Sequence, residues 1–206
     1  MQRSADPTIA VFDIGGVLID WNPRYLYRKL FAEDTAAMEE FLTTVCTPEW
    51  NLQQDAGRPW QDAIDELTAR YPDKAELIAA YHLHWDEMVP GPIPGTTDLL
   101  WDLKRRGNPV YCITNFSVDK LDRARERFDV LNAFDGIVIS GEVRLVKPDP
   151  AIYRRLLDDN GLKAEDTVFI DDVQKNVDGA RAVGMHAVRF VDADTLRRDL
   201  IGYGML

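Results

Sequence analysis

Five short apolar runs recur along the chain, at residues 9–12, 109–113, 136–140, 167–170 and 186–190. Each run is almost unbroken, which is the pattern of a parallel strand that is buried on both faces. The intervening and flanking segments with helical periodicity are residues 95–106, 118–128, 150–160 and 175–183. Strands that alternate with helices predict a parallel α/β sheet with right-handed crossovers.

The connection between the first two runs is several times longer than a usual crossover. It is rich in Leu, Ala, Trp and Tyr at helical spacing, and the helices expected there are residues 23–31, 35–44, 60–71 and 75–88. The prolines and glycines of residues 89–95 cannot continue a helix, so they are expected to return the chain to the sheet. We predict a core of residues 1–21 and 91–206, with residues 22–90 as a helical insert over the end of the sheet.

The composition is typical of a globular protein with a sizeable core. Of 206 residues, 46% are hydrophobic and 29% are charged. The apolar runs are far too short to cross a bilayer, and the first residues lack the apolar segment of a signal peptide. Two cysteines imply no disulfide framework. These features together lead us to expect a cytoplasmic location.

The net charge of −11 narrows the range of partners. Nucleic acids and anionic membranes both favour basic surfaces, so neither is expected as a partner. A small anionic molecule is compatible with this charge, because a nearby cation outweighs a distant negative field inside a dry pocket. The expected partner is therefore a small molecule that is itself anionic.

Polar residues follow the apolar runs, where open α/β sheets bind their ligands. They are Asp13, Thr114, Asn115, Lys147, Asp171 and Asp172. Carboxylates that converge repel one another, and a divalent cation relieves the repulsion. Oxygen ligands with room for water and phosphate suit Mg²⁺. Such a cation and a lysine would shield a phosphoryl group and let an anionic nucleophile approach it.

Four segments make the chain similar to a known family. VFDIGGVLID, ITN, VKPDPAIY and VFIDDVQKNVDGA occur in this order and resemble the four motifs of the haloacid dehalogenase superfamily. Each motif alone is weak, whereas all four at compatible spacing are specific. The resemblance covers nearly the whole chain. It implies a Rossmann-like core with an inserted all-helical cap of the C1 type, as in the sugar-phosphate phosphatases of the superfamily.

The resemblance also implies a phosphatase for a small phosphorylated metabolite such as a sugar phosphate. Asp13 would attack phosphorus and form an aspartyl-phosphate, which water then hydrolyses. Thr114 would hydrogen-bond the transferring phosphoryl group, with Asn115 assisting beside it. Lys147 would neutralise Asp13 and a phosphate oxygen.

The same resemblance implies a bound Mg²⁺. Its ligands would be Asp13, the backbone carbonyl of Gly15 and Asp172. Asp171 would be either a further ligand or a partner of the bound water molecules. Asn176, which follows in the same motif, would either orient Asp171 or lie at the surface.

One position departs from the family pattern and leaves alternatives open. Most phosphatases of the superfamily carry a general acid and base two residues after the nucleophile, where this chain has Gly15. A residue of the lid could take over the role of the missing acid, or the substrate could have a leaving group that needs no proton. 2-Haloacid dehalogenases also lack that aspartate, but they need no metal and usually carry Ser and Asn where this chain has Asp171 and Asp172. A non-catalytic phosphate-binding protein is the second alternative.

The insert is expected to select the substrate, because the short spacing between Thr114 and Lys147 leaves no room for a second lid. Lids of this kind close over a substrate and exclude water. Arg24 is the candidate to hold a distal anionic group. The polar segment of residues 49–59 is expected to be a loop. Its candidates to bind hydroxyl groups are Gln53, Gln54 or Asp55, and Gln54 is the one taken as a site residue.

Overall fold

A parallel sheet of five strands organises the computed structural model, which describes residues 7–206. The strands are β1 (Ile9–Phe12), β4 (Val110–Thr114), β5 (Gly136–Ile139), β6 (Thr167–Asp171) and β7 (His186–Arg189). Their order is β5-β4-β1-β6-β7, so the chain starts at the centre of the sheet and builds outward in both directions. The predicted fold class and all five predicted strands are confirmed. A ligand site is expected beyond the carboxyl ends of β1 and its neighbours, where the strand order reverses.

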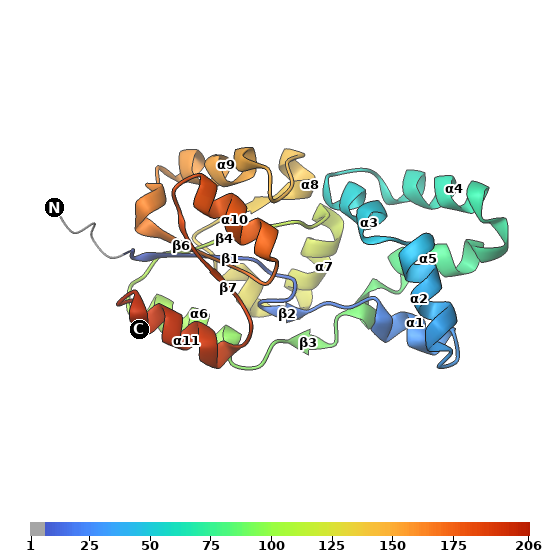
Figure 1. Ribbon diagram of the computed structural model, residues 1–206, viewed down its shortest axis with the longest axis horizontal. Helices are drawn as coiled ribbons and strands as arrows, with labels where there is room; N and C mark the ends of the chain where they lie inside the picture. The colour runs from blue at the N-terminus through green and yellow to red at the C-terminus, as the bar shows by residue number, and fades with distance from the viewer. Residues whose placement is uncertain (1–6) are drawn as a thin grey trace.

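Helices cover both faces of this sheet (Figure 1). One face packs against α6 (Thr96–Arg105), α7 (Val118–Arg127) and α11 (Ala193–Gly202), and the other packs against α9 (Pro150–Asn160) and α10 (Gln174–Ala182). Side chains of β1 alternate between the two layers: Ala10 and Phe12 join the first cluster and Val11 joins the second. Because both faces are covered, the strands read as unbroken apolar runs.

The segment between β1 and β4 is mostly helical. Its helices are α1 (Arg24–Leu30), α2 (Thr35–Thr44), α3 (Pro48–Asp55), α4 (Trp60–Arg70) and α5 (Ala75–Leu83), with short 3₁₀ turns at η1 (Pro72–Lys74) and η2 (Trp85–Met88). They lie to one side of the sheet (Figure 1) and enclose a hydrophobic cluster of their own around Tyr27, Trp60 and Tyr81. The division into residues 22–90 and a core of 1–21 and 91–206 stays a prediction, and residues 1–6 lie outside the described part.

A small two-stranded sheet forms where the chain leaves the large sheet and where it returns. Strand β2 (Ile19–Asp20) pairs antiparallel with β3 (Gly91–Pro92). The backbone N–H of Ile93 also donates to the carbonyl of Leu18, at 2.9 Å. These bonds hold the outgoing and returning segments together at the base of the helical part.

The segment 49–59, expected to be a loop, is in fact helical over most of its length. Helix α3 starts after Thr47, whose hydroxyl accepts a hydrogen bond from the backbone N–H of Trp50 at 3.1 Å. Pro48 occupies the first turn, where a missing N–H costs nothing. The Thr-Pro-Glu sequence is therefore a helix start, and the polar composition beyond it reflects one solvent-facing side of the helix.

The remaining elements are short. They are α8 (Ser140–Val143), η3 (Asp129–Asn132) and η4 (Ala164–Asp166). No helix in residues 7–206 has both the length and the apolar character needed to cross a membrane.

The layer formed by α9 yields a stability prediction. Leu156 is fully buried against the sheet, whereas Arg154 on the same helix is exposed. We expect Leu156→Ala to lower the free energy of unfolding by about 2–5 kcal/mol, because it leaves a cavity in a packed layer. Arg154→Ala is the matched control and should change it by less than about 0.5 kcal/mol. Urea unfolding of both variants measures the change in the free energy of unfolding. Equal changes for the two variants would contradict the packing of Leu156 between α9 and the sheet.

Candidate active site

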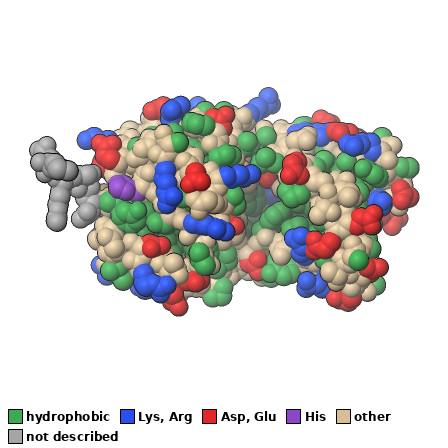
Figure 2. Space-filling model, viewed as in Figure 1, with side chains coloured by type: hydrophobic (Ala, Val, Ile, Leu, Met, Phe, Trp, Pro, Cys, Tyr) green, Lys and Arg blue, Asp and Glu red, His purple; other side chains and the backbone are tan. Residues whose placement is uncertain are grey.

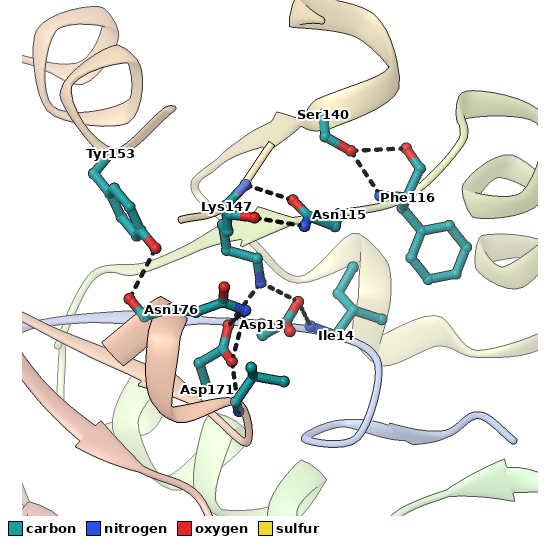
Figure 3. Close-up of polar contacts among 10 residues, drawn as sticks. Asp13, Ile14, Asn115, Phe116, Ser140, Lys147, Tyr153, Asp171 and Asn176 are labelled. Atoms are coloured by element: carbon teal, nitrogen blue, oxygen red, sulfur yellow. Dashed lines mark hydrogen bonds and ion pairs between the residues drawn. The ribbon is translucent and has the colours of Figure 1, made fainter. Parts of the chain in front are cut away.

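The carboxyl ends of β1, β4 and β6 border one cavity of about 440 Å³. Asp13 follows β1 directly, Asn115 follows β4, and Asp172 follows β6. Lys147 reaches the same place from the segment after β5 (Figure 3). In the space-filling view the surface is hollowed between the sheet and the helical part (Figure 2).

Lys147 is the cation at the centre of the cluster, and its side chain is 1% exposed. Its Nζ lies 2.8 Å from Asp13 Oδ1 and 2.7 Å from Asp171 Oδ2. Burial alone lowers the pKa of this ammonium, but the charges of Asp13 and Asp171 outweigh burial and raise the pKa above its ordinary value. Lys147 is therefore held in its charged form.

Asn115 holds the backbone of Lys147 in place (Figure 3). The N–H of Lys147 donates to Asn115 Oδ1 at 2.8 Å, and Asn115 Nδ2 donates to the carbonyl of Lys147 at 3.2 Å. This two-point bond fixes where the lysine enters the cavity. Sequence reasoning placed Asn115 beside the substrate; the structure shows both ends of its amide bound to Lys147.

Asp13 directs one carboxylate oxygen into the protein. Oδ1 accepts the N–H of Ile14 at 2.7 Å and lies against Lys147. In the described chain, Oδ2 takes no protein donor and is the oxygen available to the cavity. Burial raises the pKa of Asp13 to about 7, Lys147 opposes that rise and Asp171 adds to it. A further cation nearby would therefore favour the ionised carboxylate.

Asp171 is fully buried and its carboxylate is occupied by protein donors. Oδ1 accepts from the N–H of Val173 at 2.8 Å and from Asn176 Nδ2 at 3.0 Å, while Oδ2 accepts from Lys147. Of the two roles expected for Asn176, the structure shows the orienting one. Asp171 thus aligns Lys147, and most lone pairs of the Asp171 carboxylate already accept hydrogen bonds from the protein.

Asp172 is the second carboxylate that faces the cavity. Within residues 7–206 no side chain donates to its carboxylate, and the bond from Arg189 goes to its backbone carbonyl. Burial raises the pKa of Asp172 above its ordinary value, and the charge of Asp171 raises it further. Asp172 therefore gains from a cation more than Asp171 does.

The residues present fit a bound divalent cation. Carboxylate oxygens of Asp13, Asp171 and Asp172 lie within 4.8 Å of one another. Three carboxylates share one ammonium, so the cluster is short of positive charge. Hard oxygen donors beside an open cavity suit Mg²⁺, which keeps several water ligands. Gly15, whose carbonyl was the other expected ligand, also lines the cavity.

The hydroxyl of Thr114 is buried at the end of β4. Its Oγ1 has no hydrogen-bond partner within the described chain. An unpaired buried hydroxyl costs stability, and such groups in native proteins usually serve a ligand or water. Thr114 is fully buried and is not one of the residues that line the cavity, so its contact to a phosphoryl group stays a prediction.

Two candidates for substrate binding are not brought to the cavity. Arg24 is half-exposed and paired with Glu39, with 2.7 Å between Nη2 and Oε2, and it does not line the cavity. Gln54 is buried, donates to the carbonyl of Trp50 and borders a separate depression. Both side chains are used for packing within the helical part.

Asp55, one of the three residues considered in the polar segment 49–59, does border the cavity, together with a face of α3 that sequence reasoning did not identify. The members of this face share helical spacing and are Pro48, Asn51, Leu52 and Asp55. These are positions i, i+3, i+4 and i+7 of one helix face. Gln54 lies one residue away and points elsewhere.

The outer wall of the cavity is largely aromatic. Its apolar members are Trp21, Leu52, Trp60, Trp85, Phe116 and Val173. Two polar atoms that border the cavity are bound to protein groups: Trp60 Nε1 donates to Ser117 Oγ at 3.3 Å, and Lys120 Nζ donates to the carbonyl of His82 at 2.9 Å. The charged ends of Glu49 and Lys175, which also border the cavity, have no hydrogen-bond or ion-pair partner within residues 7–206. The wall therefore offers apolar surface more than free hydrogen-bonding groups.

Comparison with known proteins places the chain in a family. A model of haloacid dehalogenase-like hydrolases matches residues 7–184. A sesquiterpene phosphatase of Aspergillus oryzae is 29% identical over 184 residues, 89% of this chain and 90% of that enzyme. A phosphoserine phosphatase of Thermus thermophilus is 30% identical over 132 residues, 64% of this chain and 52% of that enzyme.

A solved structure shows the same fold. A HAD family enzyme of Bacteroides thetaiotaomicron, crystallised with magnesium and inorganic phosphate, superposes with a TM-score of 0.69 at 23% identity. The match covers 90% of this chain and 95% of that one. The family model spans most of the sequence, and the resemblance noted from the four motifs is confirmed. This chain is an enzyme that belongs to the haloacid dehalogenase-like hydrolases.

Proposed function

We propose that the enzyme is a magnesium-dependent phosphatase that hydrolyses a small phosphate monoester through an aspartyl-phosphate on Asp13. The observation that carries the proposal is the buried cluster in which Lys147 bridges Asp13 and Asp171 while Asp172 faces the same cavity. The phosphatase relatives and the neighbour crystallised with magnesium and phosphate support it.

The geometry assigns a task to each side chain. Asp13 Oδ2 attacks phosphorus, and the bond from phosphorus to the leaving oxygen breaks. Lys147 and the hydroxyl of Thr114 stabilise the charge on the transferring phosphoryl group. Asp13, Asp172 and the carbonyl of Gly15 would hold a Mg²⁺ ion, which would supply further positive charge beside the phosphoryl group when bound. Water then attacks the aspartyl-phosphate and restores Asp13.

We further propose that residues 22–90 act as a cap. Helix α3 and Trp60 of this segment form the wall that faces Asp13 across the cavity. A wall that closes over the reacting groups excludes water and strengthens the electrostatic interactions inside. We refer to residues 22–90 as the cap.

The aromatic wall favours a substrate whose leaving group is apolar. Trp60, Trp85 and Phe116 line the cavity with apolar side chains, and the polar atoms of Trp60 and Lys120 already have protein partners. A sugar would leave several hydroxyl groups without partners in such a wall, which is costly. The name of the Aspergillus relative, a sesquiterpene phosphatase, agrees with an apolar leaving group. We therefore place an apolar organic phosphate ahead of the sugar phosphate suggested by the family resemblance.

The alternatives fit the cluster less well. A 2-haloacid brings its own carboxylate, which the acidic cluster of Asp13, Asp171 and Asp172 would repel. A non-catalytic phosphate-binding protein would need no exposed nucleophile oxygen beside the cavity. Measurements of phosphate release and halide release distinguish both alternatives from the proposed phosphatase.

A substrate panel tests the reaction itself. Phosphate release from prenyl, alkyl and sugar phosphates, and halide release from 2-haloacids, are measured with magnesium and with a chelator. We expect magnesium-dependent phosphate release, highest for the apolar esters, and its loss in Asp13→Asn. Halide release without magnesium would instead identify a dehalogenase, and phosphate release by Asp13→Asn would exclude the covalent route.

Lys147 yields a prediction for stability. Lys147→Met removes the single ammonium between Asp13 and Asp171 and leaves their charges buried without a partner. We expect the free energy of unfolding without metal to fall by about 3–5 kcal/mol. Added magnesium should restore part of it, because a cation replaces some of the lost charge. Lys163→Met, at an exposed lysine, is the control. Thermal unfolding of both variants is measured with and without magnesium. The same change in stability for both variants would contradict the role of Lys147 in balancing the buried charges.

Gly16 yields a prediction for the metal site. Its φ is +74°, and a Cβ there would lie 2.6 Å from Asp172 Oδ2. Gly16→Ala must displace the Asp172 carboxylate, so we expect the magnesium concentration for half-maximal activity to rise about 10–100-fold. Gly202→Ala, where a Cβ meets nothing within 4 Å, should leave it unchanged. A magnesium titration of phosphate release that does not distinguish the two variants would remove Asp172 from the ligand set.

A further inference from the structure

The reaction needs a group that protonates the leaving oxygen, and Gly15 cannot supply it. A Cβ at Gly15 would meet nothing within 4 Å, so the side of the cavity where the family pattern places an acidic side chain is open. A proton donor must therefore come from another element that borders the same cavity.

Three carboxylates outside the Asp13 cluster are near enough in sequence or space to be considered. Asp20 accepts a hydrogen bond from the hydroxyl of Tyr25 at 2.7 Å and does not line the cavity. Glu49 lines the cavity but is exposed at its rim. Asp55 lines the cavity and is partly buried at the end of α3. Asp55 is the one that combines access to the reacting groups with shelter from water.

Contacts on both sides hold Asp55 in position. Within the cap, Asn51 Nδ2 donates to Asp55 Oδ2 at 2.9 Å. Across to the core, the hydroxyl of Ser140 donates to the backbone carbonyl of Asp55. Gly57 lies so close to the carbonyl oxygen of Gly141 that a Cβ there would approach it to 2.7 Å. The end of α3 is thus docked on the core next to Asp13.

The surroundings of Asp55 favour its protonated form. Burial raises its pKa to about 8; the backbone of Ser117 lowers it, Asp13 and Asp119 raise it, and Lys147 lowers it. The Asp55 carboxyl therefore holds a proton at neutral pH, which is the state that a general acid requires.

We propose that Asp55 of the cap is the general acid and base of the reaction and replaces the side chain that Gly15 lacks. The inference rests on the proposed phosphatase function. In the first step, Asp13 forms a bond to phosphorus, the bond to the leaving oxygen breaks, and that oxygen takes the proton of Asp55 to leave as an alcohol. In the second step, the Asp55 carboxylate takes a proton from water as the water oxygen bonds to phosphorus. The bond from phosphorus to Asp13 then breaks, and phosphate leaves.

This arrangement ties the chemistry to closure of the cap. The nucleophile belongs to the sheet and the acid belongs to α3, so both are present only when α3 is seated on Ser140 and Gly141. A leaving group that fills the aromatic wall would itself hold the cap in place. Binding energy from the apolar group would then contribute to assembling the acid beside the phosphoryl group.

The test compares Asp55→Asn with the wild-type enzyme on two esters. On an alkyl phosphate, whose leaving group needs a proton, we expect turnover to fall about 10²–10⁴-fold. On p-nitrophenyl phosphate, whose leaving group needs none, we expect a burst of p-nitrophenol followed by slow turnover. Mass spectrometry should then detect a phosphoryl group on Asp13, because the base for the second step is missing.

Matched variants separate an acid–base role from a structural one. Asp62→Asn, at an exposed acidic residue of α4, should behave as wild type. Glu49→Gln should keep most alkyl phosphatase activity; if it shows the losses expected of Asp55→Asn, the acid is Glu49 and the assignment is overturned. Gly15→Asp in the Asp55→Asn background should recover part of the activity on the alkyl ester, because Gly15 has an ordinary φ and open space for the new side chain.

The wild-type enzyme offers a readout that depends on no variant. Hydrolysis of the alkyl phosphate should decline as the pH rises past about 8, where the Asp55 carboxyl loses its proton, while p-nitrophenyl phosphate hydrolysis should not decline there. Equal pH profiles for the two esters, or normal alkyl turnover by Asp55→Asn, would overturn the role of Asp55 and leave the phosphatase function intact. Absence of any phosphate release by the wild-type enzyme would instead overturn the function itself.

Discussion

The structure depends on one balance of charge at the edge of the sheet. The ammonium of Lys147 lies between Asp13 and Asp171, and Asp172 adds a third carboxylate, with oxygens of all three within 4.8 Å of one another. Taking these charges out of water is costly, and one cation offsets only part of the repulsion. The hydrogen bonds from Asn176 and the backbone of Val173 satisfy Asp171, while Asp13 and Asp172 keep oxygens toward the cavity. The cluster is therefore short of positive charge, and this deficit is the physical basis for the proposed binding of Mg²⁺ and of a phosphoryl group beside it.

The parallel sheet makes this concentration of charge possible. β1 lies between β4 and β6, and the carboxyl ends of the three strands bring Asp13, Thr114 and Asp171 to one edge. Helices on both faces bury the strands, so these side chains extend from the end of a packed apolar layer. Lys147 comes from an irregular segment, and the side-chain amide of Asn115 fixes its backbone through two hydrogen bonds. The groups proposed for phosphoryl transfer are thus all set by the core.

The cap contributes the other half of the cavity. α3, Trp60 and Trp85 of the cap line the cavity together with Trp21 and Phe116 of the core, and Ser140 anchors the end of α3 to the core. The proposed division of labour is simple: the core binds and transfers the phosphoryl group, and the cap binds the leaving group and protonates it. In this proposal, changes in the cap away from Asp55 would alter the choice of substrate while the residues for phosphoryl transfer stay in the core.

The amino-acid sequence alone determined the strands, their alternation with helices and the residues at the strand ends. These follow from local patterns: an unbroken apolar run is a buried strand, and the residue after it must lie at the edge of the sheet. Tertiary structure decided the rest. It paired Arg24 with Glu39, buried Gln54 under Trp50 and turned Asp55 to the cavity, although Gln54 and Asp55 are neighbours in the chain. One residue along a helix rotates a side chain by more than a quarter turn, and which face meets the core depends on how α3 docks on Ser140 and Gly141. That docking is a contact between distant segments, and no local pattern encodes it.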